Sequence, residues 1–257
     1  MSAAPVIELR GIGTRFGRQV VHDGLDLSIG AGELVAIIGG SGTGKSVLLR
    51  EIVGLHRPDA GSVRLLGVDV WQASEPELAA VRRRFGMMFQ DGALFSSLTV
   101  AANVAVPLRE SGLVPESMIE PLVALRLAQA GLPPDAGAKM PSQLSGGMRK
   151  RAAIARALAL EPEVLFLDEP TSGLDPITAR AFDRLLESLC EDLGITVVVV
   201  THDLDTLTTI ARRIVVLGGG RVAGDGTLEE VSASDDPWIR EYFSSRKMPA
   251  GEESDGR

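Results

Sequence analysis

The sequence has a single cysteine and no long hydrophobic run. Cys190 is the only cysteine among 257 residues, so the chain cannot form an internal disulfide, and a reducing compartment fits this composition. No apolar stretch approaches the roughly 18 residues of a membrane-spanning helix. The first residues, MSAAPVIELRG, lack the basic start and apolar core of a signal peptide. The sequence therefore predicts a cytosolic chain that reaches a membrane only by docking on another protein.

Positive charge is also in short supply. Lys and Arg total 26 against 34 Asp and Glu, which gives a formal net charge of -8. Nucleic-acid surfaces bind phosphate backbones mainly through clustered Lys and Arg, so this balance argues against a nucleic-acid partner. The hydrophobic fraction of 45% is ample for the packed core of one large domain or two small ones.

Short apolar runs predict strands near both ends of the chain. They are VIELRGI, LDLSIG, ELVAIIG, EVLFLDEP, ITVVVVTHD and RIVVLGGGRVAGDG. The runs VLFL and TVVVV are apolar on both faces, as strands of a parallel sheet covered by helices are. Helical patterns dominate from about 98 to 160, and we expect breaks at Pro107, Pro115, Pro121 and PSQLSGG. The predicted fold class is α/β with a helical insertion.

The stretch IIGGSGTGKSVLL, residues 37 to 49, is a glycine-rich loop between a strand and a helix. Its residues Gly39, Gly44, Lys45 and Ser46 satisfy the pattern GxxxxGK[ST]. In such a loop the amides bind the β-phosphate, the lysine bridges the β- and γ-phosphates, and the serine hydroxyl ligates Mg²⁺. We therefore expect ATP to contact Gly39, Gly40, Ser41, Gly42, Thr43, Gly44, Lys45, Ser46 and Val47.

Two carboxylates follow the hydrophobic run VLFL. Asp168 and Glu169 stand at the end of a predicted parallel strand, and the carboxyl ends of such strands face the crevice where ligands bind. Asp168 is expected to hold Mg²⁺, and Glu169 is expected to act as the general base toward water. Many strands end in acidic turns, so the preceding phosphate loop is what favours this interpretation.

A second candidate phosphate site lies in QLSGGMRKRAAIARALAL. Ser145, Gly146 and Gly147 stand at the start of a predicted long helix, where a hydroxyl and unencumbered amides could meet a phosphate. A plain serine N-cap explains Ser145 equally well, but it does not require two glycines. The spacing leaves open whether this element meets the first loop within one molecule or between two.

Together these motifs resemble those of the ATP-binding-cassette (ABC) transporter ATPases. Their order along the chain is an aromatic residue, the phosphate loop, a glutamine, LSGGM, LFLDE, SGLD at 172 to 175 and a histidine. The aromatic residue is Phe16, the glutamine is Gln90 and the histidine is His202. The resemblance covers roughly residues 5 to 240, with one departure: Met148 stands where the family usually has glutamine.

The resemblance implies a P-loop NTPase fold. It would have a RecA-like parallel-sheet core, an N-terminal antiparallel β subdomain and an α-helical subdomain inserted at about 95–160. The ATPase domain would span residues 5–243, and the polar segment 244–257 is expected to be disordered.

The resemblance also implies roles for the remaining motif residues. Phe16 would stack on adenine, Gln90 would link Mg²⁺ to the transport machinery, and His202 would join Lys45 and Glu169 in catalysis by contacting the γ-phosphate. Ser145 to Gly147 of one subunit would close over ATP on the other in a head-to-tail homodimer. Simpler roles exist: a surface aromatic for Phe16, a strand-end polar residue for Gln90 and a structural cap for His202. His22 and His56 have no supporting motif and are assigned structural roles.

The stretch GMMFQDGALFSSLTVAANVAVPLRE resembles the lipid-transport branch of the family, although related importers share FQ and LTV. This implies a permease, a mammalian-cell-entry-type lipid-binding protein and a peripheral position on the cytoplasmic face of the inner membrane. Leu94 and Phe95 are expected to contact the permease, or else to fill the helical core. The alternatives are an importer ATPase for another substrate, a soluble cassette ATPase acting on nucleic acid or ribosomes, and a non-hydrolysing scaffold. One copy of each motif, net acidity and the presence of Glu169 argue against the last two.

Overall fold

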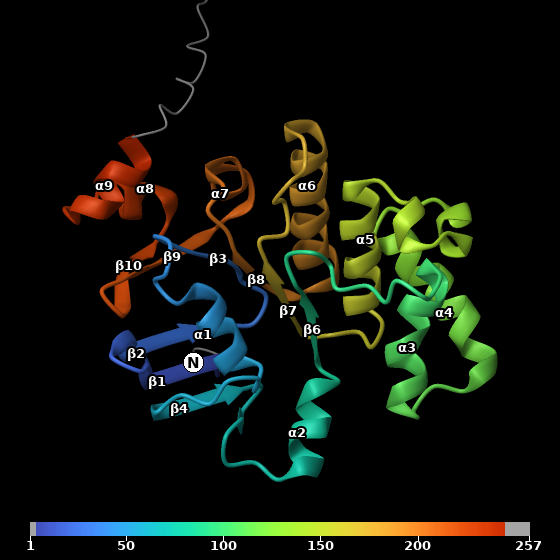
Figure 1. The fold of residues 1–257 in the computed structure, drawn as a ribbon, viewed down its shortest axis with the longest axis horizontal. Helices are drawn as coiled ribbons and strands as arrows, with labels where there is room; N and C mark the ends of the chain where they lie inside the picture. Colours follow the sequence, from blue (N-terminus) through green and yellow to red (C-terminus); the bar gives the residue numbers. More distant parts are fainter. Residues whose placement is uncertain (1–3, 245–257) are drawn as a thin grey trace, which may run out of the picture.

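The computed structural model describes residues 4–244, whose chain path is drawn in Figure 1. Four strands near the N-terminus form an antiparallel sheet with the order β2-β1-β4-β5. Their bounds are β1 Ile7–Phe16, β2 Gln19–Ile29, β4 Ala60–Leu65 and β5 Val68–Asp69. The inward side chains of β1 and β2 alternate with exposed ones, as in a sheet with one solvated face. The predicted N-terminal antiparallel subdomain is confirmed.

The second sheet has six strands in the order β10-β9-β3-β8-β7-β6. The strands from β9 to β6 run parallel, and β10 pairs antiparallel with β9. Their bounds are β3 Leu34–Gly39, β6 Phe85–Met88, β7 Val164–Asp168, β8 Thr196–Val200, β9 Arg213–Gly218 and β10 Arg221–Gly226. Strands β3 and β8 are buried along their whole length, which confirms the parallel sheet covered on both faces.

Helices cover this sheet and continue to one side of it. Figure 1 shows α1 (Lys45–Ile52) at one face and α6 (Pro176–Leu193) and α7 (Leu204–Ile210) at the other. The short helix α2 (Glu75–Arg82) precedes β6, and α8 (Leu228–Ser232) and α9 (Pro237–Ser244) follow β10. Cys190 is buried on α6 with Leu186 and Leu189, in agreement with a core role. Within residues 4–244, no helix is both long and apolar enough to cross a bilayer.

The helical insertion contains α3 (Val100–Ser111), α4 (Glu116–Gln129) and α5 (Gly146–Ala157). Two 3-10 helices, Pro134–Ala138 and Pro141–Gln143, connect α4 to α5. The predicted breaks at Pro107 and Pro121 are wrong, because these prolines lie inside α3 and α4. Each loses one backbone donor, and burial of the neighbouring Leu108 and Val123 in the subdomain core offsets that loss. Tertiary packing therefore overrides the local signal.

The run RIVVLGGGRVAGDG forms a hairpin of two strands, where the sequence predicted one strand. The turn between β9 and β10 uses Gly219 and Gly220, which both have positive φ, at 57° and 78°. The proposed domain limits, 5–243, stay a prediction. Of the predicted disordered tail, 244–257, Ser244 is the last residue of α9, and residues 245–257 lie outside the described residues.

Candidate functional site

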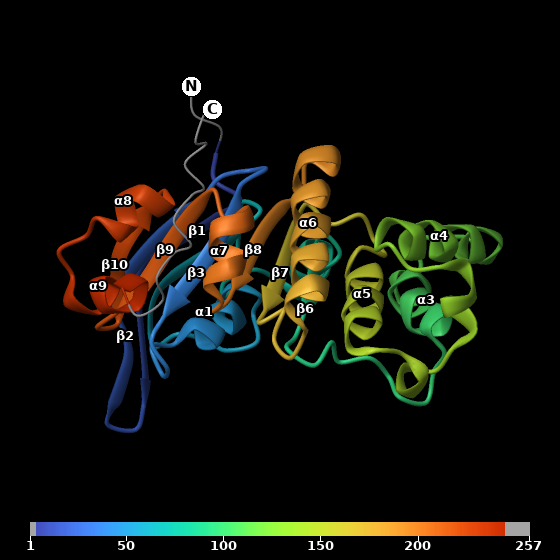
Figure 2. The ribbon, with the colours of Figure 1, turned by 90° about the horizontal axis from the view of Figure 1, so that it is seen from above.

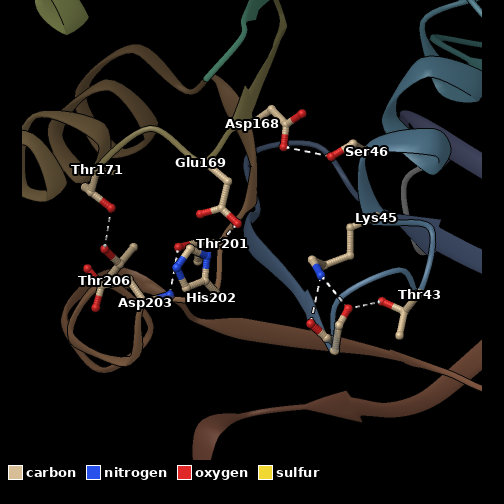
Figure 3. A network of polar contacts seen from close by, with 12 residues as sticks. Thr43, Lys45, Ser46, Asp168, Glu169, Thr171, Thr201, His202, Asp203 and Thr206 are labelled. Atoms are coloured by element: carbon tan, nitrogen blue, oxygen red, sulfur yellow. Dashed lines mark hydrogen bonds and ion pairs between the residues drawn. The ribbon is translucent and has the colours of Figure 1, made fainter. Parts of the chain in front are cut away.

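The carboxyl ends of three neighbouring parallel strands meet at one edge of the larger sheet. The P-loop, defined as Gly39–Ser46, leaves β3, His202 follows β8, and Asp168 and Glu169 end β7. The register pairs Val200 with both Ile37 and Asp168, so these three strands end side by side. This is the edge at which open α/β sheets bind ligands. Figure 3 shows Lys45 and Ser46 on one side of this edge and the residues from β7 and β8 on the other.

The P-loop closes around the side chain of Lys45. The Lys45 Nζ donates hydrogen bonds to the backbone carbonyls of Gly39 at 2.7 Å and Gly40 at 2.9 Å, and Thr43 Oγ1 also donates to the Gly40 carbonyl (Figure 3). A Cβ on Gly39 would lie 2.5 Å from the carbonyl oxygen of Leu217 on β9. Only glycine lets the loop pass this close to the neighbouring strand.

Gly44 has a different packing constraint beneath the loop. Its φ is 94°, and a Cβ there would lie 2.5 Å from Nε2 of His22 on β2. His22 is buried and its Nδ1 lies 3.0 Å from Glu51 Oε2 on α1, while the Thr14 hydroxyl donates to the other Glu51 oxygen. His22, assigned a structural role from sequence, thus supports the P-loop from the antiparallel sheet.

The electrostatics of the loop suit a phosphate ligand. Burial lowers the pKa of Lys45, and the nearby Glu169 and Asp168 carboxylates act in the opposite direction. Lys45 and its neighbours stand at the start of α1, where the first amides of a helix have no intrahelical acceptor. The P-loop therefore brings the Lys45 ammonium, the first amides of α1 and its own glycine-rich backbone to the place where a triphosphate would lie.

Ser46 and Asp168 provide a pair of oxygen atoms for a hard cation. The Ser46 hydroxyl donates to Asp168 Oδ1 at 3.2 Å, which joins the P-loop helix to the end of β7 (Figure 3). Among residues 4–244 there is no cluster of three His, Cys, Asp or Glu side chains able to hold a metal. Mg²⁺ is commonly bound through one or two carboxylates together with substrate phosphates, and this donor pair fits that pattern.

Glu169 and His202 are in direct contact. His202 Nδ1 lies 2.8 Å from Glu169 Oε1 (Figure 3), and the Glu169 amide donates to the carbonyl of Val200 on β8. Glu169 has a φ of 50°, a conformation that non-glycine residues seldom adopt and that is over-represented at functional sites. Its side chain is 15% exposed and that of His202 is 66% exposed. A shielded carboxylate suits a general base toward water, and the accessible imidazole beside it can reach a phosphate.

Gln90 lies at the same edge, in the turn beyond the end of β6. It follows β6, whose Met88 pairs with Leu167, so the chain passes Asp168 as it leaves the sheet. The Gln90 backbone carbonyl accepts a hydrogen bond from Lys150 on α5, and Lys150 also donates to the Glu169 carbonyl at 3.3 Å. Burial lowers the pKa of Lys150. Lys150 carries no sequence signal for this position, since no spacing rule joins it to residues 60 and 19 positions away.

The LSGGM segment lies apart from the P-loop of its own chain. In both ribbon views α5 stands on the far side of α6 from α1 (Figures 1 and 2). Ser145 is the N-cap of α5 and accepts the Met148 amide, as the simpler interpretation of this serine expected. A Cβ on Gly147 would lie 2.5 Å from Thr178 Cγ2, whereas one on Gly146 would make only ordinary contacts. Packing within the chain therefore explains Gly147 and leaves Gly146 exposed beside Ser145.

The side chain of Met148, which replaces the usual glutamine, packs against the core of the helical insertion. At the other end of the site, Phe16 is the last residue of β1 and stacks on His56, with ring centroids 5.1 Å apart. Phe16 remains 48% exposed, which leaves ring surface for a planar base. Leu94 packs against the core of the insertion, while Phe95 is half exposed.

Comparison with known proteins adds independent findings. A protein-family model described as ABC transporter matches residues 22–172. The chain is 39% identical to MlaF of Haemophilus influenzae, an intermembrane phospholipid transport system ATP-binding protein, over 98% of this chain and 92% of MlaF. It is 39% identical to Mkl of Mycobacterium bovis, a probable ribonucleotide transport ATP-binding protein, over 94% of this chain and 67% of Mkl. It is 41% identical to MetN of Brucella abortus, a methionine import ATP-binding protein, over 91% of this chain and 63% of MetN.

Solved structures agree with the sequence comparison. A dimeric post-hydrolysis state of the ATP-binding cassette MJ0796 bound to ADP and Pi matches with a TM-score of 0.78 and 34% identity, over 86% of this chain and 98% of that chain. A second dimeric structure of MJ0796, titled a bacterial ABC transporter cassette, matches equally well. The same fold thus occurs with the products of ATP hydrolysis bound.

Proposed function

Because the chain belongs to the ABC transporter family of ATPases, we propose that it is the subunit that powers a membrane phospholipid transporter. The chain is the nucleotide-binding subunit of an ABC transporter, hydrolyses ATP to ADP and phosphate, and uses ATP with Mg²⁺. The phospholipid substrate, the individual residue roles and the partners are the proposal.

The observation that carries the chemistry is the convergence of Lys45, Asp168, Glu169 and His202 at one sheet edge. Lys45 and the amides at the start of α1 hold the β- and γ-phosphates, and Ser46 with Asp168 holds Mg²⁺, which neutralises phosphate charge when bound. Glu169 accepts a proton from the attacking water. His202 orients Glu169 through their 2.8 Å contact and offers its exposed ring to the γ-phosphate.

Two chains are proposed to complete each other's sites. Ser145 and Gly146 are exposed at the N-terminus of α5, on the far side of α6 from the P-loop of their own chain. A head-to-tail pair related by a two-fold axis would bring this helix start over the nucleotide of the partner, and symmetry would make two equivalent sites. The dimeric state of MJ0796 in both solved structures supports the pairing of two chains.

The phospholipid substrate is favoured by the extent of the match to MlaF. The alignment covers 92% of MlaF but only 63% of MetN, so MetN has a large segment with no counterpart in the aligned part of this chain. The name of MlaF supports a phospholipid substrate. The proposed partners, a permease and a lipid-binding protein of the mammalian-cell-entry type on the cytoplasmic face of the inner membrane, are those implied by the sequence resemblance to the lipid-transport branch. An importer of another substrate is the second candidate, since MetN is 41% identical.

The permease contact is proposed to involve Phe95. Asn103, which is buried, bonds to both backbone groups of Phe95 and so fixes the segment that follows Gln90. Phe95 is half exposed, while Leu94 packs into the helical insertion, so only Phe95 of the predicted pair is available to a partner.

The test is reconstitution of the complex purified from its native membrane into liposomes. With ATP, the wild-type complex should move labelled phospholipid between donor and acceptor membranes, and a Lys45→Ala complex should not. Uptake of methionine or ribonucleotide without phospholipid transfer would refute the lipid assignment while leaving the ATPase assignment intact.

A further inference from the structure

The C-terminal helix α9 packs beside the P-loop strand. Its Ile239 is fully buried, and Trp238, Tyr242 and Phe243 pack against a cluster formed by residues of β3, α7, β9 and α8. Figures 1 and 2 show α9 next to β10 and α8, at the end of the larger sheet that carries β9 and β3. The last described helix is thereby anchored to the strands that support the nucleotide site.

Trp238 lies against the P-loop at Gly40. A Cβ on Gly40 would be 3.3 Å from the indole Nε1 and 3.7 Å from Cε2. The Gly40 carbonyl is the one that accepts hydrogen bonds from both Lys45 and Thr43. The indole therefore abuts the part of the loop that sets the position of the Lys45 ammonium.

Tyr242, one turn further along α9, reaches the other side of the site. Its hydroxyl donates a hydrogen bond to the backbone carbonyl of His202 at 3.0 Å. The rings of Trp238 and Tyr242 are stacked, with centroids 5.0 Å apart and planes inclined by 21°. One stacked pair thus joins the P-loop to the segment that carries the histidine in contact with Glu169.

We infer that α9 is a positioning element of the ATP site, in which Trp238 sets the P-loop through Gly40 and Tyr242 sets His202 through its backbone. The inference rests on the proposed roles of the P-loop and His202. Misplacement of a reacting group by about 1 Å can cost up to about 100-fold in rate, so fixing both loops to one helix has a direct catalytic consequence. Neither residue touches the nucleotide in this scheme.

Tyr242→Phe removes only the hydroxyl and keeps the ring stack. We expect kcat for ATP hydrolysis to fall about 10-fold, the order expected for one lost hydrogen bond, with KM for ATP unchanged. Glu241→Gln, an exposed neighbour on α9, is the control and should keep wild-type kinetics. A Tyr242→Phe enzyme with wild-type kcat would overturn the role of the hydroxyl.

The P-loop contact is tested by a double-mutant cycle. Gly40→Ala should raise KM for ATP because its Cβ meets the indole, and Trp238→Leu should also raise KM because the loop loses its support. In the double variant the leucine leaves room for the new methyl group. The increase in KM should therefore be smaller than the product of the two single-variant increases. Independent, multiplicative effects on KM would show that Trp238 does not act through Gly40. If Trp238→Leu lowers the melting temperature below the assay range, Trp238→Phe takes its place in the cycle.

Intrinsic fluorescence provides a reading that does not depend on turnover. The chain has two tryptophans, so Trp71→Phe leaves Trp238 as the reporter. In a Trp71→Phe, Glu169→Gln background, addition of Mg·ATP should change the Trp238 emission with a midpoint equal to the ATP dissociation constant measured by filtration. An unchanged emission at saturating Mg·ATP would overturn the inference, whereas absence of ATP binding by filtration would refute the proposed function instead.

Discussion

The Lys150 ammonium lies 3.3 Å from the backbone carbonyl of Glu169 and donates to that carbonyl and to the carbonyl of Gln90. Lys150 is buried one turn into α5, the helix that Ser145 caps. One side chain therefore connects the segment proposed to act on the partner's nucleotide with the base and glutamine of its own site.

Replacing Lys150 should slow hydrolysis more than it weakens binding. Lys150→Met leaves the Gln90 and Glu169 carbonyls without their charged donor, and we expect kcat to fall about 10-fold with the ATP dissociation constant unchanged. Lys150→Arg, which keeps the charge and several donors, should recover part of the rate. Steady-state phosphate release and nucleotide binding measure the two effects, and wild-type kcat in Lys150→Met would show that the connection is dispensable.

The proposed dimer gives a prediction about Ser145. In a Glu169→Gln background, ATP should drive dimerisation, because bound nucleotide is not consumed. Ser145→Arg should prevent the dimer while ATP still binds the P-loop, since a bulky cation would occupy the helix start that must approach the partner. Ser117→Arg, an equal change on the exposed surface of α4, is the control. Multi-angle light scattering with ATP would contradict the proposal if the Ser145→Arg protein still dimerises.

Asp183 on α6 predicts a pH dependence of stability. It is buried, accepts hydrogen bonds from Thr206 on α7, and burial raises its pKa to about 6; the hydrogen bond from Thr206 opposes this, and the Asp203 and Asp205 carboxylates add to it. The unfolded chain has a lower pKa for this group, near 4. The folded state therefore binds the extra proton, and the contribution of Asp183 to the free energy of unfolding falls as pH rises from about 4 to about 6.

Asp183→Asn removes this dependence and keeps an acceptor for Thr206. The stability of the variant relative to wild type should rise across that interval, by on the order of 1 kcal/mol, and stay constant above it. Urea unfolding at a series of pH values measures the difference. A difference independent of pH between 4 and 7 would mean that the carboxyl group does not titrate in this window.

The sequence predicted the site where the chemistry depends on local motifs and on strand ends. Lys45, Ser46, Asp168 and Glu169 follow from such motifs, because parallel strands bring their carboxyl ends to one edge. His202 lies at the same edge, and its contact with Glu169 is seen only in the structure. Predicting these residues required no information about contacts between segments that are distant in the sequence.

Contacts between distant segments could not be predicted in this way. The hydrogen bond from Tyr242 to His202 spans 40 residues, and His22 lies against Gly44 because the antiparallel sheet and α1 share one core. Pro107 and Pro121 were misjudged for the same reason, since the buried faces of α3 and α4 stabilise helices that local propensity disfavours. Such contacts depend on the assembled core rather than on any short window of sequence.

The rate of phosphate release from Glu169→Gln tests whether Glu169 is the base of the ATP-hydrolysing site. We expect Mg·ATP to bind this variant with wild-type affinity while hydrolysis falls by on the order of 100-fold or more. Glu163→Gln, which alters an exposed carboxylate paired with Arg84 beside the opposite end of β7, should leave the rate unchanged. A Glu169→Gln enzyme that releases phosphate at a rate close to wild type would contradict the account.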